Sequence, residues 1–146
     1  MPVPYASAVI PADATAVWQA VRPFDALSVW HPDIAVSELE GDKRTTEVGA
    51  VRHLTLADGG TEVREMLVAF DDTARSYTYE FVSSPFPVRS YRSTIRVAPV
   101  TNSGRSFVEW WAVYDADAAD EAELTATFAD GVYATGLAGL TTHFGG

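Results

Sequence analysis

Apolar residues recur at every fourth position near the C-terminal end of the chain, between about Asp120 and Phe144. This spacing predicts one long amphipathic helix. Asp120 is a suitable N-cap with Glu123 three residues on, an approximate capping box, and Gly145–Gly146 is expected to end the helix. The apolar stripe consists of Leu124, Phe128, Val132, Gly136 and Leu140, widened by Ala129, Tyr133, Leu137 and Phe144.

Upstream of this helix, most of the chain has the pattern of strands. The segment 5–10 is apolar and β-prone. Six further strands are expected, and they are separated by short polar turns at hairpin spacing. Such a series predicts an antiparallel meander. The six strands are expected at 34–40, 51–56, 62–70, 76–82, 91–100 and 106–114.

Two short helices are expected between the first strand and the others. Asp13 can cap a helix that runs to about Arg22, and a second helix is expected from Phe24 to Trp30, where His31–Pro32 ends it. Together these elements predict an α+β fold, in which a curved antiparallel sheet of about seven strands wraps around the long C-terminal helix. The seam between helix and sheet is the expected ligand site.

Alternation along the strands predicts which side chains face that helix. Strand 62–70 offers two sets, one containing Glu65 and the other Arg64, and periodicity alone leaves both open. In the last strand Trp111 and Val113 are expected to face outward, where an exposed tryptophan is typical of a subunit contact and favours a homodimer. The inward sets of the two strands before it are Tyr77, Tyr79 and Phe81, and Tyr91, Ser93, Ile95 and Val97.

The composition excludes several classes of function. With 146 residues, 47% of them hydrophobic, the chain is expected to form a single domain over residues 1–146. Ten basic residues among twenty acidic ones give a net charge of −10, which disfavours nucleic acid and anionic membranes as partners. The sequence contains no cysteine, no signal-peptide pattern and no apolar run near the roughly 18 residues of a membrane helix. These features fit a cytoplasmic protein.

The order of the expected elements and a series of short motifs resemble the START/Bet v 1-like (SRPBCC) helix-grip superfamily, in particular its polyketide cyclase/dehydrase branch. The resemblance covers essentially the whole chain, and plant abscisic-acid receptors share the same fold. The motifs are Pro11-Ala12-Asp13, Val17-Trp18, Val21-Arg22-Pro23-Phe24-Asp25, Trp30-His31-Pro32, Val48-Gly49-Ala50-Val51-Arg52, Glu65-Met66-Leu67, Asp71-Asp72, Tyr77-Thr78-Tyr79, Tyr91-Arg92-Ser93 and Val108-Glu109-Trp110.

The resemblance implies an internal cavity and settles strand 62–70 in favour of an inward Glu65. It does not imply hormone reception of the abscisic-acid type, because the receptor's lysine falls near Ala35, its gate loop is the shorter segment 57–61, and its latch is Phe86-Pro87-Val88. The implied cavity wall is Arg52, Leu54, Leu56, Glu65, Tyr79, Phe81, Tyr91, Ser93, Trp110, Phe128 and Val132, to which we add Trp30 and Tyr133 as candidate ligand contacts.

Arg52 and Glu65 are the candidates for chemistry, together with the hydroxyl of Tyr91 or Tyr79. One interpretation is a structural ion pair, because a buried charge is costly unless it is paired. The other is that Arg52 holds a substrate carboxylate or enolate while Glu65 transfers a proton. The tyrosines are either core aromatics or hydrogen-bond donors to a ligand oxygen. Our catalytic candidates are therefore Arg52, Glu65 and Tyr91.

No metal or cofactor is expected. The histidines His31, His53 and His143 are scattered, without HExxH or 2-His-1-carboxylate spacing, so structural or solvated roles are expected for all three. Gly59-Gly60 lacks the lysine and helix that a phosphate loop needs, and there is no G-x-S-x-G elbow.

The leading functional hypothesis is a cytoplasmic polyketide cyclase/dehydratase-like protein of bacterial secondary metabolism. It would bind a hydrophobic, aromatic or polyketide-like small molecule and catalyse its cyclisation or dehydration as a lyase or isomerase. A non-catalytic carrier or sensor of the same fold is the rival hypothesis. A third is an interaction module that uses the outer sheet face around Trp111.

Overall fold

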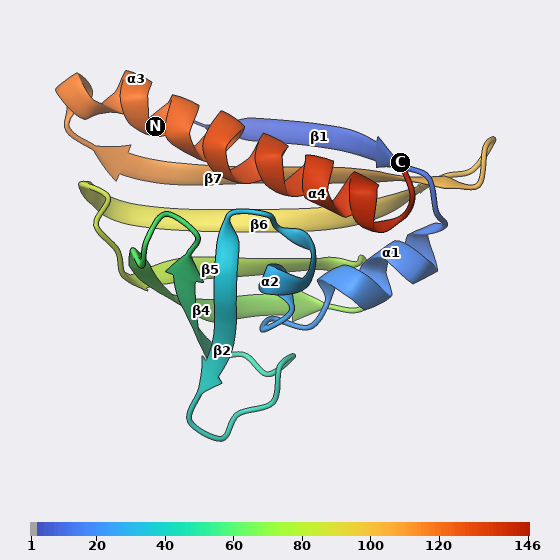
Figure 1. The fold of residues 1–146 in the computed structure, drawn as a ribbon, viewed down its shortest axis with the longest axis horizontal. Coiled ribbons are helices and arrows are strands. Elements are labelled where there is room, and N and C mark those ends of the chain that lie inside the picture. Colours follow the sequence, from blue (N-terminus) through green and yellow to red (C-terminus); the bar gives the residue numbers. More distant parts are fainter. Residues whose placement is uncertain (1–2) are drawn as a thin grey trace.

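A computed structural model describes residues 3–146 as a curved antiparallel sheet with a long helix lying across one face (Figure 1). Within these residues the sheet has seven strands in the order β1-β7-β6-β5-β4-β3-β2, which confirms the predicted α+β helix-grip arrangement. The first strand pairs with the last because the chain leaves the sheet for two short helices and returns at the opposite edge. The strands are β1 (Tyr5–Ile10), β2 (Ile34–Glu40), β3 (Val51–Leu56), β4 (Glu62–Asp71), β5 (Ser76–Ser83), β6 (Val88–Val100) and β7 (Arg105–Ala116).

The two short helices are α1 (Ala14–Val21) and α2 (Leu27–Trp30). Asp13 caps α1 as predicted, because its side chain accepts a hydrogen bond from the Ala16 N–H at 2.8 Å. The second helix begins three residues later than predicted. Residues 23–26 form a turn instead, in which the Ala26 N–H donates to Pro23 O and the Phe24 N–H donates to Thr45 O in the β2–β3 loop. This turn buries Phe24 completely beneath the sheet.

The C-terminal helix is continuous but not uniform. It consists of α3 (Ala118–Ala126), a π-helical segment η1 (Thr127–Ala134) and α4 (Thr135–His143). The predicted capping box is wrong, because Asp117 occupies the N-cap and Asp120 lies in the first turn. There its negative charge favours the helix N-terminus without a capping bond. The π-helical segment was not predicted, since an apolar repeat of four residues fits α- and π-helical turns almost equally well.

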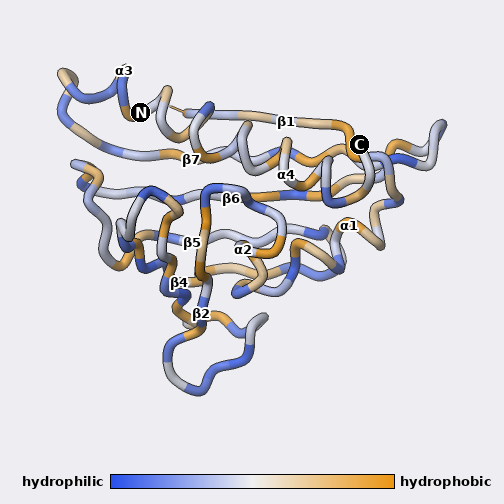
Figure 2. The backbone as a smooth tube through the Cα atoms, viewed as in Figure 1, coloured by the Kyte–Doolittle hydropathy of each residue, from blue (hydrophilic) through white to orange (hydrophobic). Residues whose placement is uncertain are grey.

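Strand β5 buries the aromatic face that alternation predicts, and β4 buries the face of Glu65, which alternation left open and the family resemblance favoured. Tyr77 and Tyr79 are buried on β5, and the buried positions of β4 are Val63, Glu65 and Leu67. Figure 2 shows hydrophobic and hydrophilic residues interchanging along the strands, whereas the β2–β3 loop at the bottom of the view is mainly hydrophilic. One face of the sheet therefore supplies the core beneath the helix. No helix within residues 3–146 is both long enough and apolar enough to cross a membrane.

We expect the contact between α4 and the end of α2 to depend on Gly139. A Cβ atom at this position would overlap Trp30 O and lie 2.7 Å from Pro32 Cδ. Gly139→Ala should lower the free energy of unfolding by about 1–3 kcal/mol, because the backbone of Trp30 and the ring of Pro32 would have to shift to make room for the added methyl group. Gly131→Ala, where the Cβ would enter open space, is the matched control. It should leave stability unchanged or raise it by up to about 1 kcal/mol. Equal urea midpoints for the two variants would contradict the contact.

Candidate functional site

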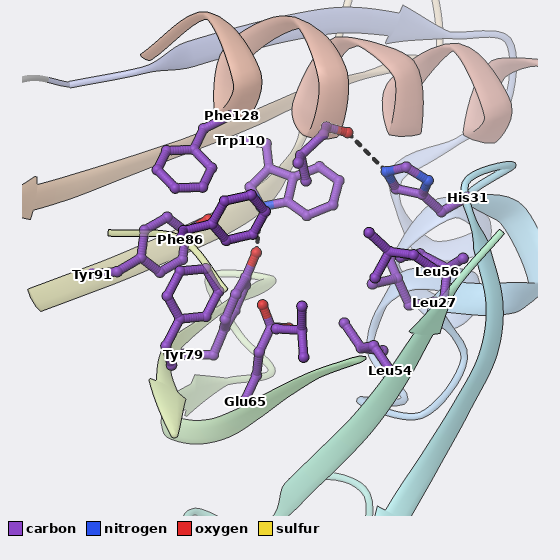
Figure 3. A pocket seen from close by; sticks show the side chains of 14 residues that line it. Leu27, His31, Leu54, Leu56, Glu65, Tyr79, Phe86, Tyr91, Trp110 and Phe128 are labelled. Carbon is purple, nitrogen blue, oxygen red and sulfur yellow. Dashed lines mark hydrogen bonds between the residues drawn. The ribbon is translucent and has the colours of Figure 1, made fainter. Parts of the chain in front are cut away.

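A cavity of about 50 Å³ lies between the C-terminal helix and the concave face of the sheet. Figure 3 shows aromatic rings on one side of it, the leucines and His31 on the other, and the carboxyl group of Glu65 pointing into the space. Its wall is formed by Leu27, His31, Ile34, Leu54, Leu56, Val63, Glu65, Tyr79, Phe81, Phe86, Tyr91, Trp110, Phe128 and Val132.

Most of the candidate residues from the sequence lie on or behind this wall. Arg52, Ser93 and Tyr133 are buried one layer behind it and hydrogen-bond to the lining residues Glu65, Trp110 and Tyr91, respectively. Trp30 lies elsewhere: it lines a separate groove between α2 and α4, so the expected ligand contact is not supported there. The candidates that line the cavity are Leu54, Leu56, Glu65, Tyr79, Phe81, Tyr91, Trp110, Phe128 and Val132.

Five lining residues were missed by the sequence reasoning. Val63 could have been found, because it shares the face of β4 with Glu65. His31 and Phe86 lie where no periodic pattern operates, at the end of α2 and in the β5–β6 loop. The missed residues are Leu27, His31, Ile34, Val63 and Phe86.

Arg52 and Glu65 face each other across β3 and β4 and form a buried ion pair. The Arg52 Nε–H donates to Glu65 Oε1 at 2.8 Å, and Nη2 lies 2.8 Å from the same oxygen without hydrogen-bond alignment. Nη1 donates to Phe24 O at 3.0 Å and to the Tyr77 hydroxyl at 3.3 Å. The guanidinium carbon lies 4.1 Å from the Phe24 ring centroid and 4.7 Å from that of Tyr79. Arg52 is thus enclosed by aromatic faces.

This geometry is inconsistent with Arg52 holding a substrate anion directly. Its side chain is fully buried and does not line the cavity, because Glu65 lies between it and the space. Burial opposes the charged form of Arg52, but the charge of Glu65 and the neighbouring tyrosines outweigh it, and the pKa of Arg52 stays above its usual value. Arg52 therefore positions Glu65 and balances its charge.

Glu65 presents its second oxygen to the cavity. Within residues 3–146 no hydrogen bond to Oε2 is present, whereas Oε1 is held by Arg52. Burial raises the pKa of Glu65 above its ordinary value, and the charge and hydrogen bond of Arg52 counteract only part of this effect. A fixed carboxyl group with a free oxygen and a raised pKa is suited to accept and return a proton.

The tyrosines join a polar network behind the aromatic wall. The Ser93 hydroxyl donates to Trp111 O at 3.1 Å, so its oxygen must accept from the Tyr133 hydroxyl at 3.1 Å. Tyr133 has then used its proton and accepts from the Tyr91 hydroxyl. Burial raises the pKa of Tyr91 well above its usual value, so its phenol stays protonated. The proton of Tyr91 is therefore committed to the network.

Tyr79 differs from Tyr91 in this respect. Its hydroxyl oxygen accepts from the Trp110 indole N–H at 3.1 Å. Ser93 Oγ is its other hydrogen-bonding neighbour, but that oxygen already accepts from Tyr133 and from Trp110 Nε1, so this assignment leaves the Tyr79 proton without an acceptor among residues 3–146. Burial raises the pKa of Tyr79 as well, so its phenol is also protonated. Of the two tyrosines considered for chemistry, Tyr79 has a hydrogen available to a ligand.

His31 is held in one neutral form. The Asp33 N–H donates to Nδ1 at 3.2 Å, so the ring proton is on Nε2, which donates to Val132 O in the π-helical segment at 2.8 Å (Figure 3). Burial lowers the pKa of His31 below its ordinary value. Both nitrogens are used, which agrees with a structural role. No group of three or more acidic or histidine side chains within residues 3–146 is arranged to hold a metal ion.

A second hollow, which we call the vestibule, lies outside the cavity and has a volume of about 330 Å³. The Phe86 ring belongs to both walls and packs edge-on against Phe128, with centroids 5.2 Å apart. The inner cavity has room for a few water molecules, whereas small-molecule sites usually measure about 300–1,000 Å³. A larger ligand therefore requires some of the side chains shared by the two walls to move. The shared side chains are His31, Ile34, Leu56, Phe86 and Val132.

Comparison with known proteins identifies relatives along the whole chain. Residues 3–145 match the model of a family described as polyketide cyclase/dehydrase and lipid transport. The structure of the protein XoxI from Bacillus cereus is 35% identical, with a TM-score of 0.87 over 99% of this chain and 96% of that chain. An uncharacterized protein from Bacillus thuringiensis is also 35% identical, with a TM-score of 0.85 over 98% of both chains.

Norcoclaurine synthase from Thalictrum flavum, solved in complex with dopamine and hydroxybenzaldehyde, has a TM-score of 0.76 at 16% identity, over 97% of this chain and 85% of that chain. At this identity the likeness concerns the fold alone. The family match over residues 3–145 confirms the resemblance to the polyketide cyclase/dehydrase branch of the SRPBCC helix-grip superfamily.

If Arg52 and Glu65 stabilise each other, removing one partner should cost more than removing both. Arg52→Met should lower the free energy of unfolding by about 3–5 kcal/mol, because the Glu65 carboxyl stays buried without its counter-charge. The double variant Arg52→Met/Glu65→Met should recover most of that loss in urea denaturation. A double variant as unstable as the single one would contradict the ion-pair interpretation.

Proposed function

The chain belongs to the polyketide cyclase/dehydrase and lipid transport family, and on this premise we propose that it binds a small hydrophobic molecule between the C-terminal helix and the sheet. The observation that carries the proposal is the Glu65 carboxyl group, which presents a free oxygen to an otherwise apolar cavity. Keeping a charged carboxyl group buried costs free energy even when a counter-charge is present. Its position in the wall of the cavity between helix and sheet supports a role toward a bound molecule.

The ligand is an aromatic or polyketide-like compound in this proposal. Aromatic side chains from β5, β6, β7, the β5–β6 loop and the C-terminal helix surround the space, and their faces suit a flat, weakly polar molecule. These side chains are Tyr79, Phe81, Phe86, Tyr91, Trp110 and Phe128.

The proposed chemistry is proton transfer during cyclisation or dehydration. Glu65 would remove a proton from a carbon beside a ligand carbonyl, and the resulting enolate carbon would attack a second carbonyl of the same molecule. In a cyclisation, Glu65 would then return its proton to the new alkoxide. In a dehydration, the enolate formed by the same proton removal would instead expel a β-hydroxyl group, and Glu65 would give its proton to that oxygen, which leaves as water. The walls contribute by holding the flexible chain in a folded conformation. No step uses a metal or cofactor.

The alternative is a carrier or sensor without turnover. Its support is that Glu65 is already paired with Arg52, and that His31 and Tyr91 have their hydrogen-bonding capacity committed. In this case Glu65 would orient the ligand without exchanging a proton with it. The two functions share the same binding site and differ in the fate of that proton.

Two finer expectations stay predictions. A cytoplasmic role in bacterial secondary metabolism is one of them. A homodimer is the other, and its support is that Trp111 faces outward on β7, opposite Tyr5 on the edge strand β1.

Proton exchange at an aromatic ketone distinguishes a catalyst from a carrier. We expect the protein to accelerate deuterium incorporation at the α-carbons of 2-tetralone in D₂O, followed by NMR. Glu65→Gln should abolish the acceleration while keeping affinity for the neutral fluorescent probe N-phenyl-1-naphthylamine. Glu62→Gln removes an outward-facing carboxylate from the same strand and should retain full acceleration. Binding of the probe without acceleration by the unaltered protein would favour the carrier.

Entry into the cavity should depend on Phe86. Phe86→Ala would join the cavity to the vestibule, and we expect stopped-flow association of N-phenyl-1-naphthylamine to become several-fold faster. Phe107→Ala makes the same truncation on the outer face of β7 and should leave the rate unchanged. Equal rates for the two variants would show that the ligand enters elsewhere.

A further inference from the structure

Two polar groups of the cavity are left without partners when its hydrogen bonds are assigned. Glu65 Oε2 has no donor, and the Tyr79 hydroxyl proton has no acceptor, among residues 3–146. Figure 3 shows both side chains directed into the same space, beneath the aromatic rings. Buried polar groups are rarely left unsatisfied, because each one costs free energy comparable to a lost hydrogen bond. The cavity therefore offers one acceptor and one donor to a guest.

The site also lacks a free positive charge. No lysine or arginine lines the cavity or the vestibule among the described residues, and the charge of Arg52 is balanced by Glu65 at 2.8 Å. A carboxylate or sulfonate that entered would lose its hydration without gaining a counter-ion. It would also lie next to the Glu65 carboxyl group, which adds repulsion between like charges.

A cationic ligand is disfavoured as well. It would lose its hydration in order to approach a carboxylate whose charge Arg52 already balances at 2.8 Å. The buried pair is electrically balanced as it stands, so an uncharged guest disturbs it least.

We propose that the site selects an uncharged aromatic ligand whose oxygen accepts a hydrogen bond from Tyr79 and whose O–H group donates to Glu65 Oε2, and that it rejects the corresponding carboxylates. This inference rests on the proposed function, since it names the class of molecule that the cavity takes. A phenol or an enol fulfils both requirements through a single oxygen. In the catalytic form of the proposal, Tyr79 rather than Tyr91 stabilises the negative charge that develops on the ligand oxygen.

Three naphthalenes of nearly equal size test the selection by displacing N-phenyl-1-naphthylamine from the protein. 2-Naphthol can donate and accept, 2-methoxynaphthalene can only accept, and 2-naphthoate carries a negative charge. We expect 2-naphthol to bind roughly tenfold more tightly than 2-methoxynaphthalene, the effect of one hydrogen bond to a charged group. We expect 2-naphthoate to bind more weakly than either.

Variants at the two groups make the test specific. Glu65→Gln leaves Arg52 without a counter-charge, so 2-naphthoate should gain affinity and overtake 2-naphthol. Tyr79→Phe should weaken 2-naphthol several-fold, and it leaves no orphaned indole because Trp110 Nε1 also donates to Ser93 Oγ at 3.1 Å. The outward-facing Glu62→Gln should keep the order of the unaltered protein. If Glu65→Gln does not fold, Arg52→Met/Glu65→Met replaces it and should bind 2-naphthol and 2-methoxynaphthalene equally.

The results separate failure of this inference from failure of the proposed function. Absence of any probe binding by the unaltered protein would contradict the proposed function itself. Probe binding together with equal displacement by 2-naphthol and 2-naphthoate would overturn the selection for uncharged ligands and leave the binding function standing. An order of the three ligands that is the same in Glu65→Gln, or in the double variant, as in the unaltered protein would likewise overturn the role of Glu65.

Discussion

The buried pair of Arg52 and Glu65 is the constraint on which the rest of the site depends. Two charges inside a sheet lose their hydration, and their mutual attraction repays this loss only when the geometry is good and the remaining protons find acceptors. For Nη1 the structure supplies acceptors from a distance in sequence: Phe24 O lies in the turn between α1 and α2, and Tyr77 is on β5. Among the residues described, Nη2 has only the charge of Glu65 Oε1, 2.8 Å away. The short helices thus do more than cover the sheet. Their connecting turn helps to satisfy the guanidinium that keeps the Glu65 carboxyl in place.

The π-helical segment gives the opposite wall its shape. It carries Phe128 and Val132 on the cavity side, and its Val132 carbonyl accepts from His31, which fixes the end of α2 against the helix. A π-helical turn is wider than an α-helical one and is rarely retained without a local reason. Here the reason is physical contact: the segment joins a neutral histidine, an aromatic ring and the tyrosine network in one wall. Both nitrogens of His31 are already hydrogen-bonded. This wall therefore contributes packing, and the polar groups available to a ligand lie on the sheet.

Much of the fold could be predicted from the sequence, and the residues show where such prediction ends. Alternation placed Tyr77 and Tyr79 inside without further information, because both belong to one clearly aromatic face. Alternation could not decide which face of β4 points inward, because the face with Glu65 and the face with Arg64 are of similar polarity. The family resemblance was needed to choose the face with Glu65. Phe86 was missed because a loop has no period. For Arg52 the sequence left an ion pair and an anion-binding role open, because pattern gives the face of a sheet, whereas depth beneath that face depends on the neighbours, here Glu65 and Phe24.

The small volume of the cavity does not conflict with a ligand site. Side chains that belong to both walls separate the cavity from the vestibule. Several of them, such as Phe86 in its loop, are held in place by packing and not by side-chain hydrogen bonds. Rotating one ring costs far less than deforming the sheet, where strands β3 to β6 are paired in a continuous ladder apart from the bulges in β4. The polar groups that would recognise a guest lie on the rigid strands, and the groups that must move lie at the entrance. A ligand can therefore enlarge the space without disturbing the ion pair or the free hydroxyl of Tyr79. The groups that would bind the ligand are thus different from the groups that move to let it enter.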